Sequence, residues 1–275
     1  MGNGPYDLLS GIYRPLLEKN ARAWRDPESA QRERLASILG ENADTDVGRR
    51  HGFSSIGTPE EFAKRVPAIG FEEMAADVER VAHGERNVLT AEPVLRFVKT
   101  SGTTGAAKRI PVTKSIAREV TDAQLVWLVN LLRENPKHAD GTKLNLVSPA
   151  DEDLTPAGIP VGANTGRMAR EMPWYVRMFA APHRDVLAIK DPAVRSFCVA
   201  LACAGADAGT LTTANPSTVW LLAKRLRAWA DPLAEWLGRG GLPDKTPDGV
   251  PIDAELRARV ARRFRKRAKQ AARLR

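Results

Sequence analysis

The chain contains few cysteines and no long hydrophobic run. Only Cys198 and Cys203 occur among its 275 residues. Two residues five positions apart on a helix have Cα atoms roughly 8 Å apart, beyond the roughly 7 Å limit for a disulfide, so we expect buried, reduced thiols. No apolar run approaches the roughly 18 residues that a membrane helix needs, and residues 1–5 lack a basic-then-apolar secretory pattern. These absences favour a cytoplasmic protein with no membrane span.

Histidine is scarce, and the excess positive charge is confined to one end of the chain. The four histidines show no spacing typical of metal ligands, so no metal site is predicted. Of the 42 Lys and Arg residues, ten lie within residues 257–275, where no acidic residue occurs. The remaining 32 nearly balance 33 acidic residues, so binding to nucleic acid would depend on this tail alone. Because Phe264 is its only aromatic residue, sequence-selective recognition of nucleic acid has little support.

Residues 100–108, with the sequence TSGTTGAAK, directly follow a strand-like segment at residues 94–98. Glycines let backbone N–H groups point toward phosphate oxygens, hydroxyls add donors, and the Lys108 ammonium supplies positive charge. Pro111 disfavours helix at Ile110, so the loop joins two strands, unlike a P-loop, which opens a helix. A loop of this composition alone is equally compatible with an ordinary hairpin. The order of its residues favours a polyphosphate site formed by Thr100, Ser101, Gly102, Thr103, Thr104, Gly105 and Lys108.

The order T-S-G-T-T-G-x-x-K resembles the phosphate loop of adenylate-forming enzymes, and the flanking segments narrow the resemblance. Together they are similar to the Gretchen Hagen family of acyl-acid amido synthetases, also called the auxin-responsive promoter family. The similarity covers roughly residues 10–240. The flanking segments that carry it are residues 48–53, 62–67, 83–90, 148–149, 155–160 and 211–218.

This resemblance implies an acid–amino acid ligase. Members of the family use ATP to convert a carboxylic acid to an acyl-adenylate, and an amino acid then displaces AMP to form an amide. Mg²⁺ would stabilise the phosphate charge. Carried over by position, the residues that would hold the β- and γ-phosphates are Ser101, Thr103, Thr104, Gly105 and Lys108, with Lys108 as the catalytic residue. Asn215 follows a strand and precedes a helix, so it is a candidate substrate contact, with a plain helix N-cap as the alternative.

The resemblance stops before the end of the chain. The family's motifs for adenine, ribose and an acidic metal ligand have no counterpart after Gly241. We therefore expect a truncated or split N-terminal half that is inactive alone and works with a separate C-terminal polypeptide. The alternatives are a non-catalytic remnant or binding module on the same scaffold, and a binder of nucleic acid or an anionic surface through the basic tail.

Hydrophobic periodicity predicts an α/β protein with a mixed sheet. The resemblance implies an incomplete N-terminal domain like that of adenylate-forming enzymes, followed by a basic C-terminal helix. The expected organisation is a domain over residues 1–240, a linker over 241–255 and a basic helical tail over 256–275. Expected helices cover residues 6–37, 71–81, 114–135, 192–204 and 216–229, and expected strands cover 94–98, 143–147 and 210–213.

Two local signals refine this outline. Thr58, Pro59 and Glu61 have the spacing of a capped helix start, and Asp191 before Pro192 indicates another. Residues 148–175 contain four prolines and three glycines. We expect this segment to be an irregular loop, either near the acid pocket, as the resemblance implies, or simply a surface excursion.

Overall fold

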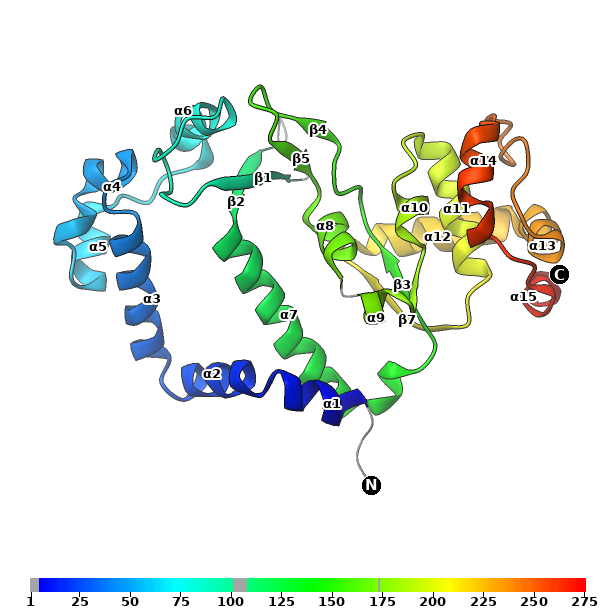
Figure 1. The fold of residues 1–275 in the computed structure, drawn as a ribbon, viewed down its shortest axis with the longest axis horizontal. Coiled ribbons are helices and arrows are strands. Elements are labelled where there is room, and N and C mark those ends of the chain that lie inside the picture. Colours follow the sequence, from blue (N-terminus) through cyan, green and yellow to red (C-terminus); the bar gives the residue numbers. More distant parts are fainter. Residues whose placement is uncertain (1–4, 101–107, 173) are drawn as a thin grey trace. The chain divides into compact units, whose positions relative to one another are not determined.

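The computed structural model describes residues 5–100, 108–172 and 174–275 (Figure 1). The chain divides into two compact units, each formed by two segments. The first contains Met1–Pro136 and Asp151–Ala163, and the second contains Lys137–Ala150 and Asn164–Arg275. Both combine helices with a small sheet, which confirms the predicted α/β class. Within the described residues, no helix is both long and apolar enough to cross a membrane.

The first unit begins with helices whose starts follow the predicted capping signals. At α5, the Thr58 hydroxyl accepts a hydrogen bond from the Glu61 N–H at 3.2 Å. The Glu61 carboxylate accepts one from the Gly57 N–H at 2.7 Å, so both side chains serve the start of the helix. The helices are α1 (Pro5–Ile12), α2 (Arg14–Arg25), α3 (Pro27–Glu41), α4 (Asp46–His51), η1 (Phe53–Ser55), α5 (Pro59–Arg65) and α6 (Phe71–Ala82).

The first unit also contains a mixed four-stranded sheet. Its order is β2-β1-β5-β4, with β1 antiparallel to β2 and parallel to β5. The strands are β1 (Val94–Lys99), β2 (Arg109–Thr113), β4 (Asp153–Leu154) and β5 (Pro160–Gly162). The 21-residue α7 (Lys114–Glu134) follows β2 directly, capped by Thr113. A core between the sheet and α6 comprises Val78, Val81, Ala82, Val88, Phe97 and Val161.

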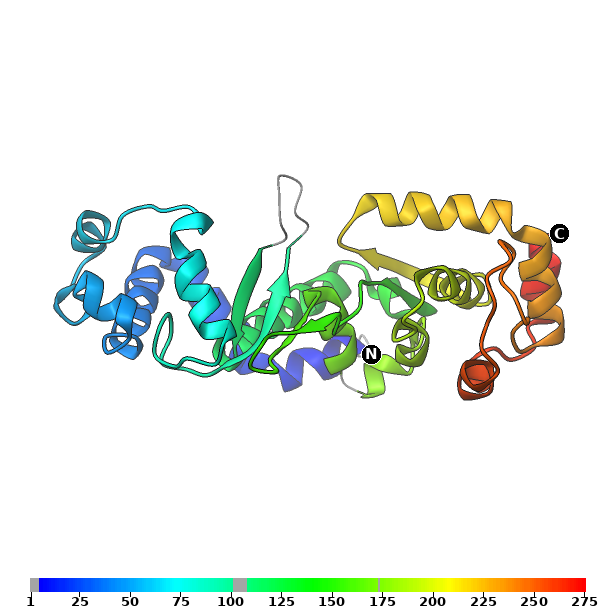
Figure 2. The same cartoon turned by 90° about the horizontal axis from the view of Figure 1, so that it is seen from above.

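The second unit contains a parallel three-stranded sheet in the order β6-β3-β7. Its strands are β3 (Thr142–Leu146), β6 (Ala180–Ala181) and β7 (Ala208–Thr213), and β7 turns back into the long α12 (Figure 2, olive to yellow). The helices are η2 (Pro136–Ala139), α8 (Asn164–Glu171), α9 (Trp174–Arg177), α10 (Arg184–Leu187), α11 (Pro192–Ala204), α12 (Pro216–Ala228), α13 (Ala230–Arg239), α14 (Ala254–Val260), η3 (Ala261–Arg263) and α15 (Ala268–Leu274).

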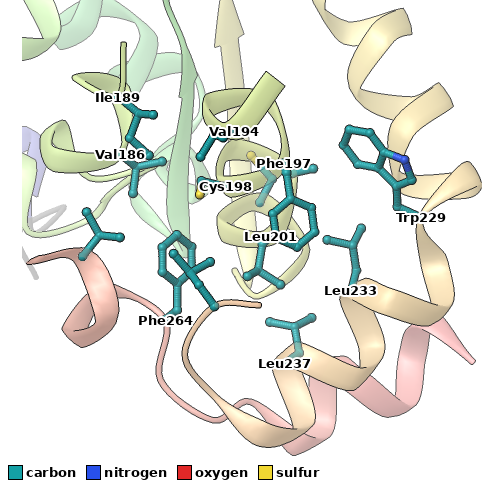
Figure 3. Packing of buried hydrophobic residues seen from close by; sticks show 14 of the residues in the cluster. Val186, Ile189, Val194, Phe197, Cys198, Leu201, Trp229, Leu233, Leu237 and Phe264 are labelled. Atoms are coloured by element: carbon teal, nitrogen blue, oxygen red, sulfur yellow. The ribbon is translucent and has the colours of Figure 1, made fainter. Parts of the chain in front are cut away.

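The core of the second unit is built around α11. Its side chains, including Phe197 and Leu201, point toward Trp229, Leu233 and Leu237 (Figure 3). The Phe197 and Trp229 rings meet edge-on with centroids 6.0 Å apart, a favoured aromatic geometry. Both cysteines of α11 are free and buried, as predicted from their spacing.

The structure differs from the expected loop over residues 148–175. This segment contains β4, β5, α8 and the start of α9. A tight turn joins the first two: the Thr155 hydroxyl accepts a hydrogen bond from the Ile159 N–H at 3.0 Å, and Gly158 has φ +76°. The prolines and glycines therefore shape turns between short elements. Periodicity misses such elements because β4 and β5 have only two and three residues.

The C-terminal segment also differs from the single basic helix expected over residues 256–275. It forms α14, η3 and α15, and its apolar side chains Val260, Phe264 and Ala271 are buried in the core. The preceding segment is anchored as well, because Leu242 and Ile252 belong to the same core. Arg263 contacts Asp185 at 2.9 Å, and Arg273 contacts Asp207 at 3.1 Å. Residues 241–275 therefore pack within the second unit, since burying their apolar side chains is favourable despite the surrounding charge.

Candidate functional site

The predicted phosphate loop joins β1 to β2. The two strands pair with Lys99 opposite Arg109, and the Thr100 N–H donates a hydrogen bond to the Lys108 carbonyl at 3.1 Å. The structure thus brings Thr100 and Lys108 together where the strand pair ends. The intervening candidates Ser101, Gly102, Thr103, Thr104 and Gly105 lie outside the described residues.

The base of this strand pair is held firmly. Phe97 on β1 is completely buried in the core formed with α6. On β2, the guanidinium of Arg109 forms an ion pair with Glu79 of α6. On the other side of β1, Phe97 lies opposite Val161 of β5. The strands therefore provide a fixed support for the loop between them.

Lys108 has two neighbours at the start of α6. Its Nζ lies 5.2 Å from the centroid of the Phe71 ring and 4.0 Å from Glu72 Oε1. The lysine side chain is 43% exposed and that of Glu72 is 81% exposed, so their attraction is weakened by water. The ammonium can therefore exchange these partners for a stronger anion such as a phosphate. Phe71 and Glu72 were not predicted as neighbours of Lys108, because nothing in the local sequence pattern places the start of α6 beside the loop.

An ion-pair network fastens α6 to α4. Arg50 on α4 contacts Asp77 on α6 at 2.9 Å, and Arg80 contacts Asp77 at 3.1 Å and Asp46 at 2.5 Å. Hydrogen bonding from the Arg50 guanidinium lowers the pKa of Asp77 below its ordinary value. The carboxylate therefore stays charged at neutral pH, and the network holds the helix that supports β1 and Lys108.

The histidines of the first unit make local contacts. His83 Nδ1 lies 2.9 Å from the Glu79 carbonyl, and His51 Nδ1 lies 3.3 Å from the Arg65 carbonyl. Neither belongs to a metal-ligand cluster: among the described residues, no group of three or more His, Cys, Asp or Glu side chains is arranged to hold a metal ion.

Asn215 lies in the second unit, at the turn between β7 and α12. Its Oδ1 accepts a hydrogen bond from the Ser217 N–H at 3.0 Å, which makes it the N-cap of α12. The N–H of Asn215 in turn donates to the Thr213 hydroxyl at 3.4 Å. The structure therefore supports the capping role, while the substrate contact stays a prediction.

The comparisons with known proteins identify the family. A model described as the GH3 family N-terminal domain matches residues 16–275. The chain belongs to the GH3 family. This confirms the resemblance inferred from the loop and its flanking segments.

Individual relatives agree with this assignment. The probable indole-3-acetic acid-amido synthetase GH3.1 of Arabidopsis thaliana is 28% identical over 165 residues, which are 56% of this chain and 28% of the relative. The probable indole-3-acetic acid-amido synthetase GH3.4 of Oryza sativa subsp. japonica is 30% identical over 152 residues, which are 54% of this chain and 24% of the relative. The alignments thus span less than a third of these curated relatives.

The fold matches that of solved GH3 structures. The GH3.15 acyl acid amido synthetase superposes with a TM-score of 0.77 at 18% identity, covering 93% of this chain and 45% of that chain. AtGH3.15 acyl acid amido synthetase in complex with 2,4-DB gives a TM-score of 0.73 at 17% identity, covering 99% of this chain and 46% of that chain. These matches confirm the predicted fold, that of the N-terminal part of a GH3 enzyme.

Proposed function

We propose that this GH3 chain takes part in ATP-dependent joining of a carboxylic acid to an amino acid. In this reaction an oxygen of the acid displaces pyrophosphate from ATP to form an acyl-adenylate, and the amine then displaces AMP to form an amide. The family match over residues 16–275 carries the proposal. Relatives described as indole-3-acetic acid-amido synthetases and an acyl acid amido synthetase support this reaction class.

The chain's part in this reaction would be to bind the phosphates of ATP. In the proposal the phosphate site is formed by Thr100, Ser101, Gly102, Thr103, Thr104, Gly105 and Lys108. Of these, Ser101, Thr103, Thr104, Gly105 and Lys108 hold the β- and γ-phosphates, with Lys108 as the catalytic residue. The exposed Lys108 ammonium and its weak contacts fit this role, because a bound triphosphate would compete readily with Glu72. Bound ATP would supply the adenylyl group that activates the acid.

The proposal also includes Mg²⁺ and a residue that contacts the acid or amine substrate. Magnesium commonly takes several ligands from phosphate oxygens and water and only one or two from carboxylates. It therefore needs no cluster of protein ligands, and the described residues contain none.

The amide NH₂ of Asn215 is not part of the helix cap described above, so we propose it as a contact to the acid or amine substrate.

Calorimetry with ATP and Mg²⁺ tests the proposal directly. We expect Lys108→Ala to weaken ATP binding by at least tenfold, because it removes the charge that faces the phosphates. The matched control is Lys64→Ala, which removes an exposed lysine from α5 and should leave the Kd unchanged. Circular dichroism of both variants checks that the fold is retained. Equal ATP affinity of the Lys108→Ala variant and the wild type would contradict the phosphate site, and no ATP uptake by the folded wild type would contradict the proposal as a whole.

A further inference from the structure

Two consecutive residues, Lys108 and Arg109, contact α6 at points two helical turns apart. The guanidinium of Arg109 forms an ion pair with Glu79. The ammonium of Lys108 lies 5.2 Å from the centroid of the Phe71 ring and 4.0 Å from Glu72 Oε1. Glu72 and Glu79 are seven residues apart, so they lie on the same face of the helix. The contact of Arg109 with this face therefore keeps the start of α6 beside Lys108.

The two neighbours of Lys108 differ in how firmly they are held. Phe71 is partly buried and packs against the core between the sheet and α6. The side chain of Glu72 is 81% exposed, so it gains little from an ion pair that fixes its rotamers and is screened by water. The ring of Phe71 is therefore the fixed neighbour of the ammonium, and the carboxylate of Glu72 is the exchangeable one.

The two contacts also use the ammonium in different ways. The face of an aromatic ring attracts a cation through its quadrupole and does not need an N–H group as a hydrogen-bond donor. The three N–H donors of a lysine ammonium can therefore point to phosphate oxygens while the ring holds the charge. A carboxylate accepts those same N–H groups, and its negative charge repels a phosphate. The contact with Phe71 is thus compatible with a bound triphosphate, whereas the contact with Glu72 competes with it.

We propose that Phe71 is a positioning residue for Lys108 and that Glu72 is the anion that ATP displaces. The ring holds the ammonium where it meets the β- and γ-phosphates. The Glu72 carboxylate contacts the ammonium in the absence of nucleotide and leaves it when ATP binds. This inference rests on the proposed function, because it concerns how the lysine of the phosphate site is placed. It predicts opposite effects on ATP affinity for two adjacent residues of α6.

Calorimetry of the full 275-residue chain with ATP and Mg²⁺ tests the role of the ring. Phe71→Leu keeps an apolar side chain against the core but removes the aromatic face. We expect it to weaken ATP binding about two- to fivefold, the value of one exposed cation–π contact. Phe71→Tyr restores the aromatic face and should bind ATP as the wild type does. The matched control is Met74→Leu, which changes another α6 side chain against the same core and should leave the Kd unchanged.

The same titration tests the exchange of Glu72. Glu72→Gln should tighten ATP binding about two- to threefold, because it removes the charge that competes with the phosphates. Glu73→Gln removes the same charge from the adjacent exposed position and should change the Kd less. Circular dichroism of every variant checks that the fold is retained.

A nucleotide-free NMR measurement separates this inference from the ATP site itself. The ring current of Phe71 should shift the ε-methylene protons of Lys108 upfield, because these protons lie close to the face of the ring. The shift should disappear in Phe71→Leu and persist in Phe71→Tyr, and loss of the signal in Lys108→Ala identifies it.

The outcomes distinguish the positioning role from the phosphate site. Wild-type ATP affinity of Phe71→Leu, failure of Phe71→Tyr to restore the affinity, or absence of the upfield shift would each overturn the role of Phe71 while the phosphate site stands. Unchanged or weaker ATP binding by Glu72→Gln would overturn the exchange. Absence of ATP uptake by the folded wild type would overturn the proposed function and this inference together.

Discussion

Cys198 illustrates how burial controls chemistry at the scale of a single residue. Its side chain is fully buried in the core of the second unit, among the residues of α11 (Figure 3). Removal from water disfavours the thiolate and raises the pKa of Cys198 to about 12, and burial raises the pKa of Cys203 to about 12 as well. Because the thiolate is the reactive form, both cysteines are packing residues and not redox groups.

We therefore expect the folded chain to resist thiol reagents. At pH 8 both cysteines should react with a disulfide reagent at least a hundredfold more slowly than a free thiol, because access and ionisation are both suppressed. Following the absorbance of the released thiolate measures the rate. The urea-unfolded chain, with two accessible thiols, provides the control. Rapid reaction of either cysteine in the folded protein would show that the core around α11 opens readily.

Lys108 shows at the same scale what local sequence can and cannot reveal. The nine-residue pattern around it predicts a phosphate loop between two strands, because hydroxyls, glycines and lysine at close spacing suit that chemistry. The contacts of Lys108 with Phe71 and Glu72 could not be predicted in the same way. They depend on how α6 packs against β1 and β2, which no short-range pattern encodes.

At the scale of secondary structure elements, α4 and α6 are joined by charge. Asp77 is only 8% exposed and receives hydrogen bonds from Arg50 and Arg80. Its pKa is lowered first by hydrogen bonding from Arg50 and then by the charges around it. A carboxylate whose pKa is lower in the folded state stabilises the fold above its unfolded pKa of about 3.9. This stabilisation is lost as the pH falls through the folded pKa.

Asp77→Asn should consequently lower the free energy of unfolding by about 1–3 kcal/mol at pH 7, because it leaves the guanidinium hydrogen bonds without their charged acceptor. The difference from wild type should shrink as the pH falls below about 4, the unfolded pKa, and should be lost once the pH is below the lowered folded pKa of Asp77. Urea unfolding at several pH values measures both effects. Glu119→Gln, which breaks the exposed pair with Arg34, is the control and should remain close to wild type. A pH-independent difference would mean that the Asp77 charge is not involved.

Helix starts were the elements most readily predicted. Thr58, Asp191 and Asn215 all accept hydrogen bonds from N–H groups two or three residues ahead, so their role is visible in the local sequence. The short strands β4 and β5 were missed because each has too few residues to show a periodic pattern, and because β5 pairs with β1, about sixty residues earlier in the chain.

At the scale of the whole molecule, the C-terminal segment completes the core of the second unit. Phe264 is 6% exposed and lies in the same cluster as the α11 side chains (Figure 3). The Arg267 N–H donates a hydrogen bond to the Leu237 carbonyl at 2.6 Å, which ties the chain before α15 to α13. Because basic residues surround these contacts, the sequence of the C-terminal segment does not reveal its structural role in the core.

Phe264→Ala should destabilise the protein by about 3–5 kcal/mol, as expected for removing a buried aromatic side chain. Equilibrium unfolding in urea measures the change. Arg265→Ala, at the neighbouring exposed position, is the matched control and should have little effect. Equal stability of the two variants would show that the segment does not contribute to the core.

The amino-acid sequence by itself determined the family, the α/β class, the capped helix starts and the two strands around the loop, because these depend on residues close together along the chain. Only the tertiary structure decided that apolar side chains of residues 241–275 are buried in the core, that α6 faces Lys108 and that β7 lies at a sheet edge. Those features depend on which distant segments pair and on how much apolar surface each arrangement removes from water. The spacing of residues along the chain reveals neither which distant segments pair nor how much apolar surface they bury.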